Sequence, residues 1–330
     1  MPGRRRAQSR HALPPNALPR SGPAPLRDPR LLADLSVRPW SASSLELWIA
    51  CPEKWFIERM LRPESPEPDP EPLARGGLAH AALRDTLEGL RERTGSARLT
   101  PARLGLAREL LGQALARHEH EHPLSARPER VPSARRRLQA DLERYLAYAA
   151  GTATGGRGED GPLEPAHLEL EFGFDEEGLP ALDLGGGVLL RGRIDRIDLT
   201  TAGEAVVYDY KGARVTPGAR WIADGKIQLA LYMRAAEQLL GLRVIGGMYQ
   251  PLGGADLRAR GVLDATAGVQ LDCVRTDLLD SSELDALIRE AIELAREAAA
   301  EAVAGAIQAR PQTCSYTGGC EYPAICRCGR

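Results

Sequence analysis

The chain has 330 residues, of which 43% are hydrophobic, and its 43 basic and 45 acidic side chains leave a formal net charge of −2. This length supplies enough apolar material for one large domain or two smaller ones. No apolar run reaches the ~18 residues of a membrane-spanning helix, and no signal-peptide core follows Met1, so we expect a cytoplasmic protein without a membrane partner. The near-neutral balance excludes a polycationic nucleic-acid coat, although it leaves room for a local basic groove.

The N-terminal half of the chain predicts a tail followed by helices. Residues 1–37 are rich in proline and arginine and show no hydrophobic period, which is typical of a disordered tail. Ser41 or Ser43 can cap the first helix, and residues 63–72 predict a loop. Helical periodicity recurs in three later stretches, so residues 38–150 form a helical part that a glycine-rich linker ends. These stretches are 77–90, 102–118 and 133–149.

The C-terminal half, residues 162–310, predicts an α/β core. Helices are expected over 221–240 and over 281–307, the second capped by Ser282. A cysteine-rich coil over 311–330 follows them. Strands are expected at 167–174, 188–199, 205–211, 244–250 and 261–274.

Charged residues fall on two neighbouring predicted strands that a short turn joins. Because side chains alternate along a strand, Asp209 and Lys211 project from the same face. Asp195, on the preceding strand, can lie next to Asp209. Facing carboxylates repel each other unless a cation lies between them, and hard oxygen ligands suit Mg²⁺ or Mn²⁺. The hairpin therefore predicts a site for a divalent metal ion.

Lys211 is unusual because Lys54 and Lys226 are the only other lysines among the 43 basic residues. Arginine would be a poor substitute here, since its proton is effectively never released, whereas the pKa of a lysine responds to its surroundings. A lysine beside a metal ion can orient or deprotonate a water molecule, or neutralise charge that grows on a phosphate. The alternative interpretation is a solvated hairpin with an ordinary surface ion pair.

Two other stretches could complete such a site. Gln228 and Tyr232 share one helical face, which could aim an amide and a phenol at Lys211 or at a phosphate. The alternatives are a solvent-exposed glutamine and a core tyrosine. His80, which follows a pair of glycines, could be an imidazole ligand of the metal ion or a buried, hydrogen-bonded histidine.

The cysteines are Cys51, Cys273, Cys314, Cys320, Cys326 and Cys328. Without a secretory signal they indicate a reducing compartment, where clustered thiols bind metal more often than they form disulfides. Three C-terminal thiolates together with Cys51 could hold an iron–sulfur cluster or a tetrahedral zinc ion. A zinc site made by the C-terminal cysteines alone is the alternative.

Taken in chain order, these motifs resemble the PD-(D/E)XK nucleases of the RecB type, and in particular the iron–sulfur nuclease domain of AddAB-type helicase–nuclease subunits. The motifs are the Ser-rich helix with Cys-Pro, Gly-x-x-x-His, Gly-x-x-Asp-Arg-Ile-Asp, Asp-x-Lys, Gln-x-x-x-Tyr and the terminal cysteine-rich coil. The resemblance covers residues 38–328 and implies one nuclease domain over 38–330. The implied α/β fold has a restriction-endonuclease-like mixed central sheet flanked by helices, a helical N-terminal part and a cysteine-rich C-terminal coil.

The resemblance also assigns roles to residues. It implies a Mg²⁺ or Mn²⁺ site whose ligands are His80, Asp195, Asp209 and the carbonyl of Tyr210. It implies Lys211 as the catalytic lysine, with Gln228 and Tyr232 as the supporting motif of the next helix. Either Glu169 or Glu171 would match an acidic position that precedes the core strands.

A structural cofactor is implied as well. The resemblance places a [4Fe-4S] cluster, with zinc as the alternative, on Cys51, Cys314, Cys320 and Cys326. The interval between Cys314 and Cys320 is longer than the one common in the family, and Cys328 is an extra thiol nearby.

The implied activity is metal-dependent hydrolysis of DNA phosphodiester bonds, as an exonuclease acting on single-stranded or free ends in repair or recombination in the bacterial cytosol. No Gly-x-x-x-x-Gly-Lys-Ser/Thr motif occurs in the sequence, so a helicase partner would act in trans. A non-catalytic DNA-binding module and a zinc protein unrelated to nucleases are the alternatives. Basic residues that could line a DNA path are Arg135, Arg136, Arg137, Arg191 and Arg193.

Overall fold

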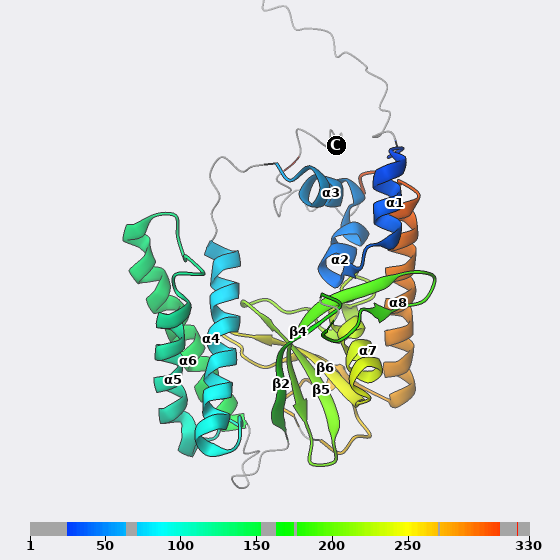
Figure 1. Cartoon of the computed structure of the whole chain (residues 1–330). Coiled ribbons are helices and arrows are strands. Elements are labelled where there is room, and N and C mark those ends of the chain that lie inside the picture. Colours follow the sequence, from blue (N-terminus) through cyan, green and yellow to red (C-terminus); the bar gives the residue numbers. More distant parts are fainter. Residues whose placement is uncertain are drawn as a thin grey trace, which may run out of the picture.

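The computed structural model of the protein describes residues 25–63, 71–152, 163–174, 177–269, 271–310 and residue 322. A mixed sheet lies at its centre, with α4, α5 and α6 on one side and α7 and α8 on the other (Figure 1). The helices are α1 (Pro29–Val37), α2 (Ala42–Ala50), α3 (Pro52–Phe56), α4 (Glu71–Thr94), α5 (Leu104–His118), α6 (Val131–Thr152), α7 (Gln228–Leu240) and α8 (Ser281–Val303). The predicted fold class, a mixed central sheet flanked by helices, is confirmed.

Strand β4 organises the sheet. The strands are β1 (Trp40–Ser41), β2 (Glu164–Phe172), β3 (Leu182–Asp183), β4 (Leu189–Leu199), β5 (Glu204–Lys211), β6 (Arg243–Pro251), β7 (Arg260–Asp264) and β8 (Leu278–Leu279). The sheet runs β1-β4-β5-β6-β7-β8, and β2 and β3 also pair with β4. The β4–β5 pair is an antiparallel hairpin, whereas β5 and β6 are parallel, so the chain needs the crossover that α7 provides.

The sheet separates two large hydrophobic cores, and a smaller cluster contains Tyr208 and Met248. On one face, residues such as Ile197, Val207 and Tyr249 pack with α2, α7 and α8 in what we call the α7–α8 core. On the other face, Tyr210 and Leu252 pack with α4, α5 and α6 in the helical core. A functional residue on β4 or β5 therefore has a packed layer on either side, which holds its backbone rigidly.

Helix caps follow local chemistry that is partly visible in the sequence. The Ser44 backbone N–H donates to Ser41 Oγ at 3.2 Å, so α2 begins at the expected cap. The cap expected at Ser282 is wrong. Asp280 caps α8 instead, in a capping box with Glu283, because its carboxylate accepts the Glu283 N–H while Ser282 only donates its hydroxyl to Asp280.

Other boundaries also differ from the expected ones. Residues 29–37, expected within the tail, form α1, where Leu35 is buried in the α7–α8 core. The expected helix over 221–240 begins only at Gln228, because Gly225 takes a positive φ of 63° that breaks helical geometry. The last long strand stops at Asp264, whose side chain accepts the Thr266 N–H in a turn. None of the helices described here combines the length and the apolarity needed to cross a bilayer.

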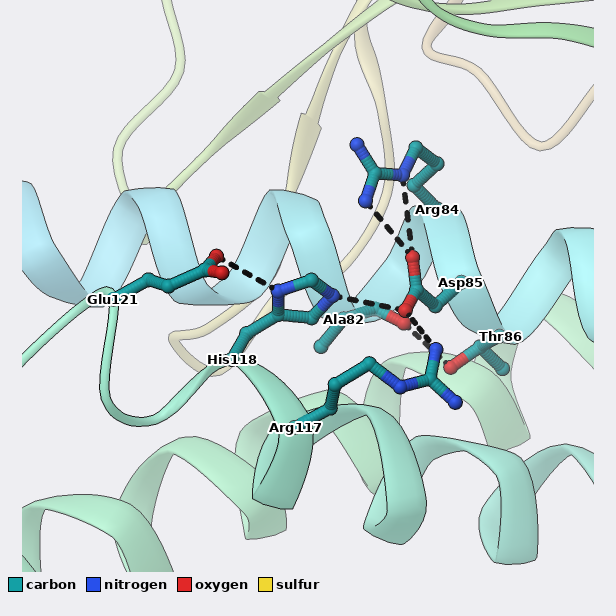
Figure 2. Close-up of polar contacts among 7 residues, drawn as sticks. All are labelled: Ala82, Arg84, Asp85, Thr86, Arg117, His118 and Glu121. Carbon is teal, nitrogen blue, oxygen red and sulfur yellow. Dashed lines mark hydrogen bonds and ion pairs between the residues drawn. The ribbon is translucent and has the colours of Figure 1, made fainter.

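A polar cluster joins α4 to the end of α5 (Figure 2). His118 Nε2 lies 2.8 Å from Asp85 Oδ2, and its Nδ1 lies 3.1 Å from Glu121 Oε2. Arg84 and Arg117 also bind the Asp85 carboxylate. These contacts fix α4, which carries His80 about a turn and a half earlier, against the neighbouring helix.

Candidate active site

The β4–β5 hairpin brings its two aspartates together. The ladder pairs Arg196 with Tyr208, so the next position along each strand sets Asp195 beside Asp209. The Tyr210 backbone N–H donates to Asp195 Oδ2 at 2.6 Å, which holds that carboxylate against β5. Asp195 is 7% exposed and Asp209 is 2% exposed, so two carboxylates meet in a largely water-free position.

Strand β2 adds a third carboxylate. Its ladder to β4 pairs the neighbours of Glu169 with the neighbours of Asp195, so these two residues lie opposite each other. Glu169 has a φ of 49°, a left-handed conformation that is uncommon for any residue except glycine. Leu168 packs against the helical core and Leu170 against the α7–α8 core, so β2 changes face at this residue. Glu169 consequently enters neither core.

His80 meets both of these carboxylates from α4. Its Nδ1 lies 3.3 Å from Glu169 Oε1 and 3.3 Å from Asp195 Oδ1. The imidazole also packs edge-on against Tyr210, with the ring centroids 5.6 Å apart. Potential ligand atoms of His80, Glu169 and Asp195 all lie within 4.8 Å of one another. We call these three residues together with Asp209 the acidic site.

The pKa values of the acidic site show how strongly its charges interact. Burial lowers the pKa of His80, but hydrogen bonding to Asp195 and Glu169 and their negative charges outweigh it and raise the value to about 10. Burial and the charge of Asp195 raise the pKa of Asp209 to about 7, against the opposing influence of Lys211 and His80. The acidic site therefore stabilises positive charge in its centre, on the imidazole or on a bound cation.

The donor set fits a divalent cation. Glu169 Oε1 and Asp209 Oδ2 are buried, and within the described part of the chain their cationic partners are His80 and Lys211. Converging carboxylate oxygens and one imidazole nitrogen match the preferences of Mg²⁺ and Mn²⁺. Such an ion would offset the mutual repulsion of these buried carboxylates.

Lys211 lies at the edge of the acidic site. Its Nζ is 2.5 Å from Asp209 Oδ2 and 3.4 Å from Gln228 Oε1. The Tyr249 ring lies beneath the ammonium group, 5.2 Å away. The Gln228 backbone N–H in turn donates to Glu46 Oε1 at 2.9 Å, which anchors the start of α7. The lysine side chain is 37% exposed, so a substrate can reach it.

The two tyrosines named from the sequence point into the cores. Tyr232 is buried against Phe172, and a Cβ atom on Gly192 would lie 2.7 Å from its ring, so β4 needs a glycine there. Burial raises the pKa of the Tyr232 phenol. The Tyr210 hydroxyl accepts a hydrogen bond from Arg196 in the other core, while its backbone faces Asp195. The role of the Tyr210 carbonyl as a ligand stays a prediction.

Two acidic residues gain significance only in three dimensions. The sequence leaves Glu169 and Glu171 as alternatives, and Glu169 is the one that faces His80, whereas the Glu171 carboxylate is 53% exposed beside Arg193. Glu46 belongs to no motif of the sequence, because its role depends on α2 packing against the start of α7. A carboxylate on an otherwise apolar helix face is the signal that could have identified it.

The arginines expected along a DNA path divide between two elements. Arg193 of β4 contacts Glu169 Oε2 at 2.8 Å, and Arg191 lies two residues further along the same side of that strand. Arg193 therefore adjoins the acidic site, whereas Arg191 lies beyond it. The other group, Arg135, Arg136 and Arg137, belongs to α6.

Cys51 lies half-buried between α2 and α3. The other cysteines expected to bind a cluster lie outside the described residues, so that site stays a prediction. They are Cys314, Cys320 and Cys326, together with the extra thiol of Cys328.

Comparison with known proteins identifies the family of the chain. A model of the PD-(D/E)XK nuclease superfamily matches residues 39–327, which include the whole acidic site and Lys211. An ATP-dependent helicase/deoxyribonuclease subunit from Desulfitobacterium hafniense (strain DSM 10664 / DCB-2) is 30% identical over 213 residues, 60% of this chain and 16% of that protein. A protein of the same name from Symbiobacterium thermophilum is 31% identical over 233 residues, 64% of this chain and 19% of its own length.

The chain therefore spans less than a fifth of the length of these curated relatives. The superfamily match, by contrast, runs through nearly all of the chain. The matched range covers both His80 of the helical part and the sheet residues Asp195, Asp209 and Lys211. The chain belongs to the PD-(D/E)XK nuclease superfamily.

Proposed function

We propose that this chain is a metal-dependent DNA nuclease that hydrolyses phosphodiester bonds. The observation that carries the proposal is the convergence of His80, Glu169 and Asp195 within 4.8 Å, beside the Asp209–Lys211 pair. Burial and the charge of Asp195 raise the pKa of Asp209 to about 7, which supports the view that these carboxylates repel each other when no cation lies between them.

The residues of the acidic site would hold Mg²⁺ or Mn²⁺, with the Tyr210 carbonyl as a further ligand. Such an ion supplies Lewis-acid polarisation of the phosphate and favours ionisation of water. Lys211 orients the attacking water and counters the charge that grows on the phosphate. Asp209 and Gln228 position its ammonium group from two directions. Tyr232 supports the β4 backbone from the core.

The substrate and partner follow from the relatives. Their name joins a helicase to a deoxyribonuclease, which supports DNA as substrate and a helicase as partner. We propose exonucleolytic action on single-stranded or free ends, in repair or recombination in the cytoplasm. A [4Fe-4S] cluster, with zinc as the alternative, would link Cys51 to Cys314, Cys320 and Cys326 as a structural cofactor and would take no part in catalysis.

A cleavage assay tests this function. Purified protein is incubated with end-labelled linear DNA and with closed circular DNA, in Mg²⁺, in Mn²⁺ and in a chelator. The expected result is metal-dependent release of nucleotides from the linear DNA and intact circles. Equal cleavage of both forms would indicate an endonuclease in place of an exonuclease. No cleavage of either form in any metal would overturn the proposed nuclease function.

A further inference from the structure

A hollow of about 130 Å³ lies where α2, β4 and the π-helix Ile57–Leu61 meet. The cationic residues that line it are Arg38, Arg59, Arg62 and Arg191, and we call them the arginine pocket. The hydroxyl-bearing residues Ser41 and Ser44, at the start of α2, complete the wall. The lining thus offers hydrogen-bond donors in excess and suits an anion.

Among the described residues, few carboxylates compensate the charges of the arginine pocket. Arg38 reaches Asp34 at 3.6 Å, but no carboxylate among the described residues forms an ion pair with Arg59, Arg62 or Arg191. The pKa of Arg38 is lowered by burial and, against the pull of Asp34, by the positive charges of Arg191 and Arg62. Convergent guanidinium groups repel one another, so an anion bound between them would remove an existing destabilisation.

The pocket is also held in shape. The Arg38 guanidinium lies over the rings of Trp40 and Trp55, at 5.6 and 5.7 Å from their centroids. Arg62 ends the π-helix with a φ of 45°, a left-handed conformation that strains a residue with a Cβ atom. Strain and π-helical turns cluster where a side chain must point in a particular direction for function.

Strand β4 connects the arginine pocket to the acidic site. Arg193 contacts Glu169 of that site, and Arg191 points from the same side of the strand into the pocket. Arg191 is four residues from Asp195, a separation of about 13 Å along the strand. At the B-form rise of about 3.4 Å per nucleotide this distance spans about four nucleotides, and fewer in a more extended single strand.

We propose that the arginine pocket binds a backbone phosphate of the DNA strand that is being cleaved, a few nucleotides from the scissile bond. The inference rests on the proposed function, which supplies the strand. Arginine is suited to this task because its planar fork pairs two N–H groups with phosphate oxygens. Such a contact carries no base information, so the pocket would set the register of the strand for any sequence.

Substitutions can remove the charge without disturbing the fold. Arg62→Gly deletes one guanidinium and also relieves the positive φ, so the melting temperature should stay equal or rise. Arg59→Ala deletes a second exposed charge. Arg108→Ala, an exposed arginine on the remote helix α5, is the matched control.

Binding of a single-stranded oligonucleotide is measured in the Lys211→Ala background at several salt concentrations. Each pocket variant should bind about tenfold more weakly, and the slope of log K against log salt should fall by about 0.7 per lost contact. In protein that keeps Lys211, the same substitutions should raise KM and leave kcat unchanged. The reason is that the lost contact contributes the same binding energy in the ground state and in the transition state.

Oligonucleotides with one neutral methylphosphonate at successive positions locate the contact. One position should weaken binding to the parent protein and have no effect on Arg62→Gly. If the pocket binds a free anion instead, Arg62→Gly should bind inorganic phosphate more weakly than the parent protein. Its methylphosphonate profile on DNA should then match that of Arg108→Ala, and this outcome overturns the proposal. Failure of the nuclease assignment would appear separately, as absence of cleavage by the unmodified protein.

Discussion

Glu169 and Glu171 are chemically identical and lie two positions apart on β2, yet their surroundings differ. In a regular strand both would face the same side. The left-handed φ of Glu169 breaks that alternation and brings one carboxylate to His80, while the other stays at the surface. A strained backbone angle at this position costs about 1–3 kcal/mol, and the packing of β2 between two cores maintains it.

This pair offers a matched test at the residue scale. Glu169→Gln keeps the shape of the side chain but removes a negative charge from the acidic site, so cleavage should fall by about 10- to 100-fold. Glu171→Gln should cleave at nearly the parental rate, because its carboxylate is exposed. Steady-state rates at saturating Mn²⁺ compare the two variants. Equal losses in both would show that Glu169 has no special role.

Lysine substitutions separate catalysis from binding. Lys211→Ala removes the ammonium group between Asp209 and Gln228, and cleavage should fall by about 10²–10³-fold or more while DNA affinity stays near that of the parent. Lys226→Ala is the control, since this lysine is nearby but pairs with Glu46 instead. Single-turnover cleavage and oligonucleotide binding are measured together. Unchanged cleavage by Lys211→Ala would contradict the assigned role.

Parts of the site follow from local rules, and parts do not. The neighbouring positions of Asp195, Asp209 and Lys211 are accessible from the sequence because strand alternation and a short hairpin turn fix them. Glu46 and Glu169 are not, since one depends on helix packing and the other on a local backbone conformation that many sequences avoid.

At the scale of elements, the same distinction explains the boundaries. The long helices α4, α5, α6 and α8 lie close to their expected ranges because their apolar periods extend over several turns. The stretch before α7 has helix-like apolar spacing, but its Trp221 is buried by an irregular turn against Tyr249. Tertiary burial and helical periodicity produce the same pattern over so short a segment.

The cluster between α4 and α5 predicts a pH effect on one element pair (Figure 2). Burial lowers the pKa of His118, but its contacts with Asp85 and Glu121 prevail and raise it. A raised pKa means that the charged imidazole stabilises the folded state fully below the ordinary value of about 6.5, and that this stability is lost as the pH rises through the folded value.

His118→Gln should therefore lower the free energy of unfolding by about 2 kcal/mol at pH 6, and by less at pH 9. Urea unfolding at both pH values measures the difference. His120→Gln, a neighbour without these contacts in the described structure, is the control. A loss that is constant with pH would mean that the ring acts by packing and not by charge.

At the scale of the whole molecule, a cluster on Cys51 would tie the first helices to the C-terminal segment. Anaerobically purified protein should then be coloured and contain iron, and Cys51→Ser should lose both the iron and part of the thermal stability. Cys273→Ser is the matched control, since Cys273 lies in the segment beyond β7. Colourless protein that contains zinc would indicate that these cysteines bind zinc and not an iron–sulfur cluster.

Metal binding should stabilise the entire fold, and protonation of the acidic site should weaken metal binding. Burial and Asp195 raise the folded pKa of Asp209 from 3.8 to about 7, so protonation of this carboxyl favours the folded state. This contribution to stability is complete below the unfolded pKa and is lost as the pH rises through about 7. His80, with a pKa of about 10, must also release its proton to become a ligand. In a chelator, stability should thus decline between about pH 4 and pH 7 relative to Asp209→Asn.

Saturating Mn²⁺ should raise the melting temperature of the parent protein, and the rise should be larger at pH 8 than at pH 6 because fewer protons compete for the acidic site. Calorimetric titration in buffers of different ionisation enthalpy should detect proton release as the ion binds. Asp195→Asn should abolish both the stabilisation and the proton release while remaining folded in the chelator. If Mn²⁺ leaves the melting temperature unchanged at every pH, the buried carboxylates have a structural role only, since a bound ion must stabilise the state that binds it.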